Sequence, residues 1–323
     1  MGACRPRRHE KDDPVFRYIA RRLLLLIPTI LGVAIITFLI MKATPGGPFD
    51  GADLGKRVSP QVIATLNAKY GFNQPLPVQF ARYVGHALRG DFGLSVQIRQ
   101  DTPVTTIIKQ GLGKTVTLGL LALAVALVIG IPLGIIAALR QNKLADYISL
   151  FLATAGASVP NFVLAIILVI IFSVRLHWIP TQGWGTPKQA ILPVLTLAFT
   201  PMAFITRITR SAMLEAINQD YVQTARSKGL TEQIVVLRHI LRNALIPVIT
   251  VAGPLAANLI VGSFIVETIF GVPGMGRLSI QAVQGRDYPV IMATTLLYAV
   301  VIAVANLLVD VLYGVIDPRV RYS

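Results

Sequence analysis

Six long apolar blocks dominate this sequence of 323 residues and leave little choice of fold. An α-helix needs about 20 apolar residues to cross the hydrocarbon core of a bilayer. The chain is 14% charged, whereas soluble domains carry about 25% charged residues. The sequence therefore predicts an all-α integral membrane protein with six membrane-spanning helices. The apolar blocks cover 23–41, 115–139, 147–174, 191–206, 245–267 and 291–314.

Basic residues in the loops predict the orientation of these helices. With the N-terminus inside, the inner segments hold 17 Lys and Arg in 76 positions, whereas the two short outer loops hold four in 39. Loops that stay in the cytoplasm carry an excess of Lys and Arg. We therefore expect both termini in the cytoplasm. The inner segments are then 1–22, 140–146, 207–244 and 315–323.

The net charge of +15 would point to nucleic acid in a soluble protein. Here the apolar blocks leave too little polar surface for a nucleic-acid domain, so we expect membrane lipid and no nucleic acid as a partner. Retention of cytoplasmic loops explains the charge instead. The first apolar block is too long for a cleaved signal peptide, so we expect a retained helix.

The chain divides into a cytoplasmic N-terminal segment, 1–22, and one transmembrane domain, 23–323. Residues 42–114 form a large outer loop that is too long for a bare connection. Apolar spacing over 60–70 predicts a small helix lying on the outer surface. Gly-Leu-Gly-Lys-Thr at 111–115 lacks the first glycine of a phosphate-binding loop, because Ile108 stands at that position.

The inner segment 207–244 contains two predicted helices. Asp220 is placed as an N-cap, and Gly229 follows Lys228 as the residue that ends a helix over 221–228. Thr231 is placed to cap a second helix over 232–242. Its apolar face is predicted to contain Ile234, Val235, Leu237, Ile240 and Leu241. This helix pair is either a solvated connector or a docking element for a cytoplasmic partner.

Ionisable residues inside a membrane are costly and usually functional. Asp310 lies inside the sixth block, where it either hydrogen-bonds nearby backbone or binds a coupling ion. Glu267 ends the fifth block, before a glycine-rich turn that it caps or gates. Gly130 and Gly134 form a Gly-x3-Gly pair, which lets two helix backbones approach closely.

Catalytic chemistry has no support in the sequence. The four histidines are scattered, the single cysteine is Cys4, and no metal-ligand spacing occurs. We therefore expect a transport subunit rather than an enzyme, with no cofactor or metal bound to this chain.

The inner loop resembles the cytoplasmic coupling motif of bacterial ABC-importer permeases of the peptide and nickel branch. The stretch Asp-Tyr-Val-Gln-Thr-Ala-Arg-Ser-Lys-Gly-Leu at 220–230 carries this resemblance, and Arg-His-Ile-Leu-Arg-Asn-Ala-Leu-Ile-Pro follows at 238–247. The general importer pattern is Glu-Ala-Ala-x3-Gly. Ala225 and Gly229 fit it, whereas Gln223 and Thr224 replace its first two residues, as in the peptide branch.

The similarity extends along almost the whole chain. Gly-Asp-Phe-Gly at 90–93 resembles the outer loop of that branch. Glu-Thr-Ile-Phe at 267–270 and Arg-Asp-Tyr-Pro at 286–289 resemble its segments after the fifth helix. Thr-Pro-Gly-Gly-Pro-Phe at 44–49 is most similar to the B-type permease of oligopeptide importers.

The resemblance implies a type I ABC-importer permease in the bacterial inner membrane. A second homologous permease would complete the translocation path, and an extracytoplasmic binding protein would deliver oligopeptide. ATP and Mg would bind to two partner ATPase subunits. The same architecture serves dipeptides, nickel or glutathione, and an ion-coupled secondary transporter that uses Asp310 is a remote alternative.

The resemblance also implies roles for the coupling segment. Asp220 would cap the helix, Ala225 would pack closely against a groove of the ATPase, and Gly229 would end the helix. Arg226 and Lys228 would pair with acidic residues of the ATPase. The implied coupling residues are Asp220, Tyr221, Thr224, Ala225, Arg226, Lys228 and Gly229.

Overall fold

The structure, a computed structural model, describes residues 14–45, 61, 64–65, 68 and 71–316. The described part is all α-helical apart from loops and one isolated bridge between Leu94 and Pro103. The helices are α1 (Pro14–Ala43), α3 (Leu76–Ala87), α4 (Val104–Leu139), α5 (Leu144–Ser158), α6 (Asn161–Leu168), α7 (Pro187–Ile217), α8 (Asp220–Ser227), α9 (Glu232–Ile234), α10 (Leu241–Val261), α11 (Phe264–Ile269), α12 (Met275–Gly285) and α13 (Tyr288–Ile316). Two π-helical segments, η1 (Val169–Arg175) and η2 (Val235–Ile240), complete them.

Five single helical segments in the described part are long and apolar enough to cross a membrane, and a bent pair makes a sixth. These five segments lie in or include α1, α4, α7, α10 and α13, and each overlaps one of the blocks predicted from the sequence. Large apolar side chains are exposed along them, as expected for surfaces that face lipid. The prediction of an all-α membrane protein is therefore confirmed.

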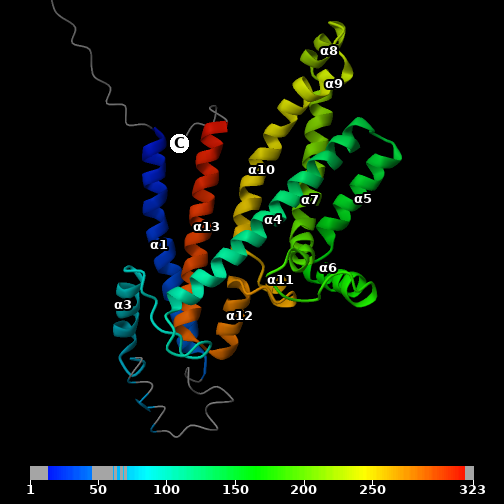
Figure 1. The fold of residues 1–323 in the computed structure, drawn as a ribbon. Coiled ribbons are helices and arrows are strands. Elements are labelled where there is room, and N and C mark those ends of the chain that lie inside the picture. The colour runs from blue at the N-terminus through cyan, green and yellow to red at the C-terminus, as the bar shows by residue number, and fades with distance from the viewer. Residues whose placement is uncertain (1–13, 46–60, 62–63, 66–67, 69–70, 317–323) are drawn as a thin grey trace, which may run out of the picture.

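The third block is not one straight helix. Its two halves, 144–156 and 161–175, meet at an angle of 109°. Pro160 explains the break, since proline disfavours helical backbone in the residue before it, and Val159 has φ −86° and ψ 120°. The predicted span over 147–174 is thus wrong as a single helix: α5 descends and α6 turns across its end (Figure 1).

The fifth block is also interrupted. α10 ends at Val261, and Gly262 adopts φ +84°, a conformation that strongly favours glycine. Ser263 then caps α11 by accepting a hydrogen bond from the N–H of Val266. Glu267 therefore lies in the separate short helix α11, which corrects its predicted place at the end of the fifth span.

Close packing of α4 against α7 forms the centre of the bundle. A Cβ on Gly130 would lie 2.9 Å from the carbonyl oxygen of Met202, and one on Gly134 would lie 2.7 Å from that of Thr206. Only glycine allows this approach, so the predicted role of the Gly-x3-Gly pair is confirmed. The surrounding apolar cluster includes Leu118, Leu197 and Ile205, all buried.

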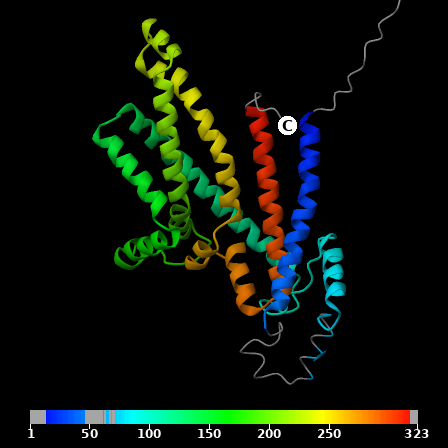
Figure 2. The same ribbon diagram turned by 180° about the vertical axis from the view of Figure 1, so that it is seen from behind.

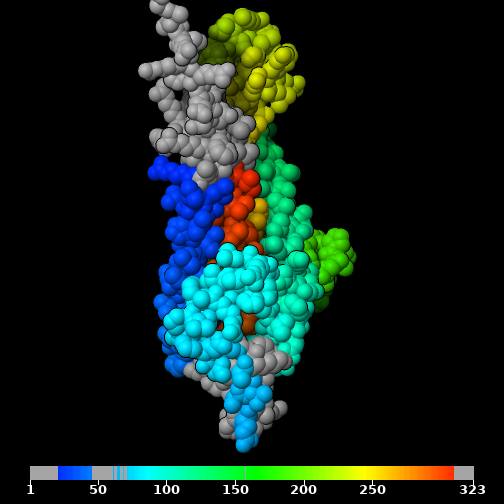
Figure 3. All heavy atoms as spheres, turned by 90° about the vertical axis from the view of Figure 1, so that its left-hand side faces the viewer, coloured from blue at the N-terminus to red at the C-terminus, as the bar shows by residue number. Residues whose placement is uncertain are grey.

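α1 and α13 form a second pair that packs beside α10 through α13. Figures 1 and 2 show the start of α1 and the end of α13 at the same end of the molecule as α8. Figure 3 shows the outer segment that contains α3 covering the opposite ends of α1 and α13. The start of α1 and the end of α13 thus lie on the side of the inner loop, as the distribution of basic residues predicts. The predicted helix over 60–70 falls mostly outside the described residues.

Candidate functional site

The inner loop forms a helical tip at the end of the bundle (Figure 1). α7 is one helix from Pro187 to Ile217, so the polar residues after the fourth apolar block continue it. α8 follows after a short turn, and the chain returns through α9. The tip is therefore held between two long helices that run back into the membrane-spanning bundle.

Gly229 ends α8 in the predicted manner. Its φ is +75°, and its N–H donates to the carbonyl of Arg226 at 2.9 Å. The N–H of Leu230 donates to the carbonyl of Ala225 at 3.4 Å. These two bonds define a Schellman motif, which satisfies carbonyls that would otherwise be unpaired at the helix end.

The start of α8 differs from the prediction. Gln219 occupies the N-cap position without a side-chain cap hydrogen bond, and Asp220 is the first helical residue. The predicted capping role of Asp220 is therefore wrong. Its carboxylate instead lies in the first turn, where the positive end of the helix dipole favours negative charge.

Ala225 faces inward rather than outward. It is 5% exposed and lies with Val222 in a buried cluster that also contains Met213, Val235 and Ile240. Ala225 therefore allows close packing within this chain, which corrects the implied contact with an ATPase groove. The other six implied coupling residues are exposed: Asp220, Tyr221, Thr224, Arg226, Lys228 and Gly229.

Arg226 pairs with the far side of the tip. Its guanidinium donates to both carboxylate oxygens of Glu232, at 2.7 and 3.2 Å. Both side chains are exposed, so the pair contributes little free energy, but its bidentate geometry joins α8 to α9. Arg226 is thus already paired within this chain, whereas Lys228 lies exposed beside it.

The predicted second helix is not a separate element. Residues 232–261 run as one continuous helical segment from the tip into the bundle, and 235–240 of it are π-helical. The extra residue per turn changes which side chains face inward. Val235, Val236 and Ile240 are buried, whereas Ile234 is 43% and Leu237 67% exposed, so the predicted apolar face is wrong in register.

Exposed apolar side chains mark the surface of the tip. Tyr221 and Leu230 join Ile234 and Leu237 in being more than a third exposed. These residues lie in the inner segment 207–244, which the distribution of basic residues places in the cytoplasm, so lipid does not explain their exposure. Solvent-exposed apolar groups beside charged ones are typical of a protein-docking surface.

At the outer side, Glu267 forms the centre of a buried polar network. One carboxylate oxygen accepts from the N–H groups of Gly276 and Arg277, at 2.7 and 3.1 Å. The other accepts from the hydroxyl of Thr115 at 2.9 Å, and that hydroxyl accepts from the N–H of Met275 at 2.8 Å. Glu267 therefore binds the N-terminus of α12 to α4, which is the geometry that the anchoring interpretation requires.

Asp287 anchors the outer loop and was missed in the sequence analysis. Its buried carboxylate accepts from the hydroxyl of Ser95 and from the N–H groups of Val96, Gln97 and Ile98. It also directly precedes the first turn of α13. A signal was available, because an aspartate just before an apolar block is a typical helix N-cap.

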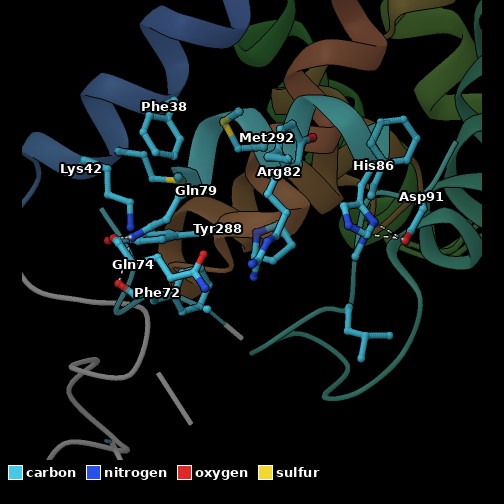
Figure 4. A pocket seen from close by; sticks show the side chains of 17 residues that line it. Phe38, Lys42, Phe72, Gln74, Gln79, Arg82, His86, Asp91, Tyr288 and Met292 are labelled. Atoms are coloured by element: carbon cyan, nitrogen blue, oxygen red, sulfur yellow. Dashed lines mark hydrogen bonds and ion pairs between the residues drawn. The ribbon is translucent and has the colours of Figure 1, made fainter. Parts of the chain in front are cut away.

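A pocket of about 280 Å³ lies between α1, α3 and the start of α13 (Figure 4). The ammonium of Lys42 lies 5.2–5.8 Å from the ring centroids of Phe38, Phe72 and Tyr288. Such cation–π contacts connect the end of α1 to the outer segment. At the rim, Nδ1 of His86 lies 3.0 Å from a carboxylate oxygen of Asp91, within hydrogen-bond distance, and both side chains are exposed.

The backbone of Asp310 lies in α13, but its side chain falls outside the described residues. Within the described part of the chain, no group of three or more His, Cys, Asp or Glu side chains is arranged to hold a metal ion.

The architecture and the tip are matched by known proteins. A family profile described as "Binding-protein-dependent transport system inner membrane component" matches residues 130–322. The chain belongs to this family. The profile of the corresponding N-terminal region matches residues 15–119. The chain is thus a multi-pass membrane permease of a binding-protein-dependent ABC system, and not the ATPase itself.

Relatives of this permease match over almost its full length. It is 41% identical to the dipeptide transport system permease protein DppB of Bacillus subtilis, over 94% of this chain and 98% of the relative. It is 42% identical to the oligopeptide transport system permease protein AppB of the same organism (94% and 99%). It is 39% identical to the oligopeptide transport system permease protein OppB of Escherichia coli (95% and 100%).

Solved structures support the fold of the permease. An inward-facing structure of the MetNI methionine ABC transporter superimposes with a TM-score of 0.56 at 18% identity. The match covers 65% of this chain and 96% of that one. An amino acid ABC transporter with histidines gives a TM-score of 0.52 at 20% identity, covering 64% and 93%.

Proposed function

We propose that this chain is the membrane-spanning subunit of an ATP-driven, binding-protein-dependent importer of short peptides. The helical tip carries the proposal: α8 is capped by a Schellman motif and presents exposed apolar and basic side chains on the cytoplasmic side. A well-ordered, exposed helix between two membrane-spanning helices suits the transmission of a movement from a cytoplasmic ATPase.

In this function, partner chains supply the free energy that drives transport. Two ATPase subunits bind ATP and Mg and close against each other, and this closure displaces α8. A second homologous permease completes the translocation path, and an extracytoplasmic binding protein delivers peptide at the opposite face. The family, which is described as binding-protein-dependent, supports this set of partners.

Individual residues of the tip take different parts in this coupling. Tyr221, Thr224 and Lys228 are exposed and suit direct contact with the ATPase. Asp220 stabilises the first turn of α8, and Gly229 fixes its end. Arg226 and Ala225 act within this chain, where they hold α8 against α9 and η2.

The substrate class follows from the relatives. Proteins named for dipeptide and for oligopeptide transport match at comparable identity and coverage. Oligopeptides are our first proposal, and dipeptides are the second. Nickel and glutathione are the remaining substrates of the same architecture.

Uptake by the reconstituted complex tests this function. Purification of this chain from its native membrane should recover a second permease and two ATPases, and vesicles containing the complex and the binding protein should import peptide only with ATP. A series of di-, tri- and pentapeptides, with nickel and glutathione as further substrates, measures the preference. Uptake by this chain alone, without ATP and abolished by Asp310→Asn, would instead reveal an ion-coupled transporter.

A glycine variant tests the coupling role of α8. Gly229→Val places a β-branched residue at φ +75°, a left-handed conformation that costs a non-glycine residue about 1–2 kcal/mol. We expect this variant to insert normally but to hydrolyse ATP without importing peptide. Gly113→Val is the matched control, since that glycine lies in α4 with no heavy atom within 4 Å of an added Cβ. Normal peptide-stimulated hydrolysis and transport in Gly229→Val would exclude this role.

A further inference from the structure

Both helix breaks of the membrane-spanning bundle meet at one cavity of about 400 Å³. Asn161 begins α6 directly after the first break, and Gly262 and Ser263 form the second. All three line the cavity, and α11 contacts both α6 and α7. Figure 1 shows α6 and α11 near each other at the outer ends of α5, α7 and α10.

Both breaks interrupt apolar blocks that are predicted to lie in the membrane, 147–174 and 245–267. Backbone that leaves the helical conformation at membrane depth is tolerated only where it is buried in protein or lines a polar cavity. Broken helices of transporters commonly line the path of the substrate. Two independent breaks, caused by Pro160 and Gly262, therefore point to a cavity that serves transport rather than packing.

The polar side chains in the cavity are neutral and incompletely paired. Thr200 donates from its hydroxyl to the side-chain oxygen of Asn161 at 3.0 Å. Among the described residues, the amide nitrogen of Asn161 and the whole side-chain amide of Asn258 have no hydrogen-bond partner. Asn258 is also exposed, so its amide is accessible to a solute. The cavity thus offers both donors and acceptors.

The remaining lining residues are mostly apolar, and no charged side chain is among them. A metal ion would require carboxylate, imidazole or thiolate ligands, which this lining lacks. A free carboxylate or ammonium group would remain unpaired here. A neutral group that both donates and accepts suits this lining, and the backbone amide is such a group that recurs along a peptide chain irrespective of its side chains.

We propose that this cavity is a peptide-binding subsite of the translocation path, in which Asn161, Thr200 and Asn258 hydrogen-bond the backbone amides of the passing peptide. The inference rests on the proposed function and adds the residues that contact the substrate. Recognition through backbone amides makes the site tolerant of peptide sequence. Apolar residues such as Leu255 and Phe264 then accept side chains without selecting strongly among them.

Thiol labelling provides a direct test in the assembled importer. The chain has one cysteine, Cys4, so Cys4→Ser gives a cysteine-free permease for single-cysteine variants. Asn258→Cys reports on the cavity. Asn306→Cys is the matched control, because Asn306 is an exposed amide in a groove between α1 and α13. Peptide with ATP and binding protein should slow labelling at position 258 several-fold and leave position 306 unchanged.

A second measurement tests the chemistry of recognition. Loss of one hydrogen bond corresponds to about a fivefold change in an equilibrium constant. We therefore expect a single backbone N-methylation of a transported peptide to reduce its uptake by about that factor. In Asn161→Ala and Asn258→Ala, uptake of the parent peptide should fall and the methylation effect should shrink. Comparison of the variants cancels any effect of methylation on the binding protein.

The outcomes separate this inference from the proposed function. Undiminished labelling at position 258 during active uptake, or an unchanged methylation effect in both alanine variants, would overturn the subsite while leaving the importer intact. Failure of the unmodified complex to import peptide would instead overturn the proposed function. Slowed labelling together with a reduced methylation effect supports the subsite.

Discussion

Thr115 connects α4 to the buried Glu267 network, and Thr115→Val removes this connection with little change in shape. The substitution leaves the N–H of Met275 without its acceptor and one oxygen of Glu267 without its donor, bonds of 2.8 and 2.9 Å. A buried polar group that loses its partner costs about 1–3 kcal/mol, so we expect the two groups together to cost about 2–6 kcal/mol. Thr115 is 1% exposed, so water does not replace these bonds.

Thr117 provides the control within the same helix. Its hydroxyl donates to the carbonyl of Gly113 at 2.8 Å and is exposed, so Thr117→Val should change stability by no more than about 0.5 kcal/mol. The thermal unfolding midpoint of the purified complex, followed by a thiol-independent fluorescent dye, measures both variants. The double variant Thr115→Val with Glu267→Gln should lose less than the sum of the single losses, because both act on one network. Equal midpoints for Thr115→Val and Thr117→Val would refute the role of the network.

Three further predictions concern the other buried and exposed carboxylates. Asp287→Asn should release the outer loop and lower its stability by about 3 kcal/mol, because an amide nitrogen then faces backbone N–H groups that need an acceptor. We expect faster proteolysis of the loop, which limited digestion measures. Arg210→Met should cost about 2 kcal/mol of unfolding free energy, since the carboxylate of Asp146 (2% exposed) loses its cationic partner and keeps the hydrogen bond from the N–H of Asn142, although Arg210 itself is 20% exposed. The N–H of Gly93 lowers the pKa of Asp91 below 3.8, so the local stabilisation is complete above pH 3.8 and is lost as the pH falls through the lowered pKa. Asp91→Asn should abolish this acid sensitivity in hydrogen exchange of the outer loop.

The sequence predicted the spans well because a bilayer imposes a simple requirement of length and polarity. Charge-free blocks of sufficient length have few other stable placements, and the basic loops fixed their orientation. Gly229 was also predictable, since glycine after a helical stretch that ends in lysine is a strong local signal. These features depend on neighbouring residues, and a single sequence contains that information.

The predictions that were wrong concern features that depend on tertiary contacts or on small changes of backbone conformation. Gly262 lies inside an unbroken apolar run, so nothing in composition separates α10 from α11. The π-helical segment η2 shifts the buried face by part of a turn, which a regular period of 3.6 residues does not anticipate. The burial of Ala225 and the pairing of Arg226 with Glu232 required the packed tip.

α7 runs without a break from the outer cavity to the cytoplasmic tip, although Pro193 and Pro201 lie inside it. One helix joins the cytoplasmic tip to the region of the outer cavity, and its 31 residues span about 46 Å at 1.5 Å per residue. A rod of that length that tilts by about 5° moves its far end by about 4 Å, comparable to the 5.4 Å pitch of a helical turn. In the proposed coupling, a small displacement of α8 would therefore be enough to rearrange contacts at the opposite face without unwinding a helix.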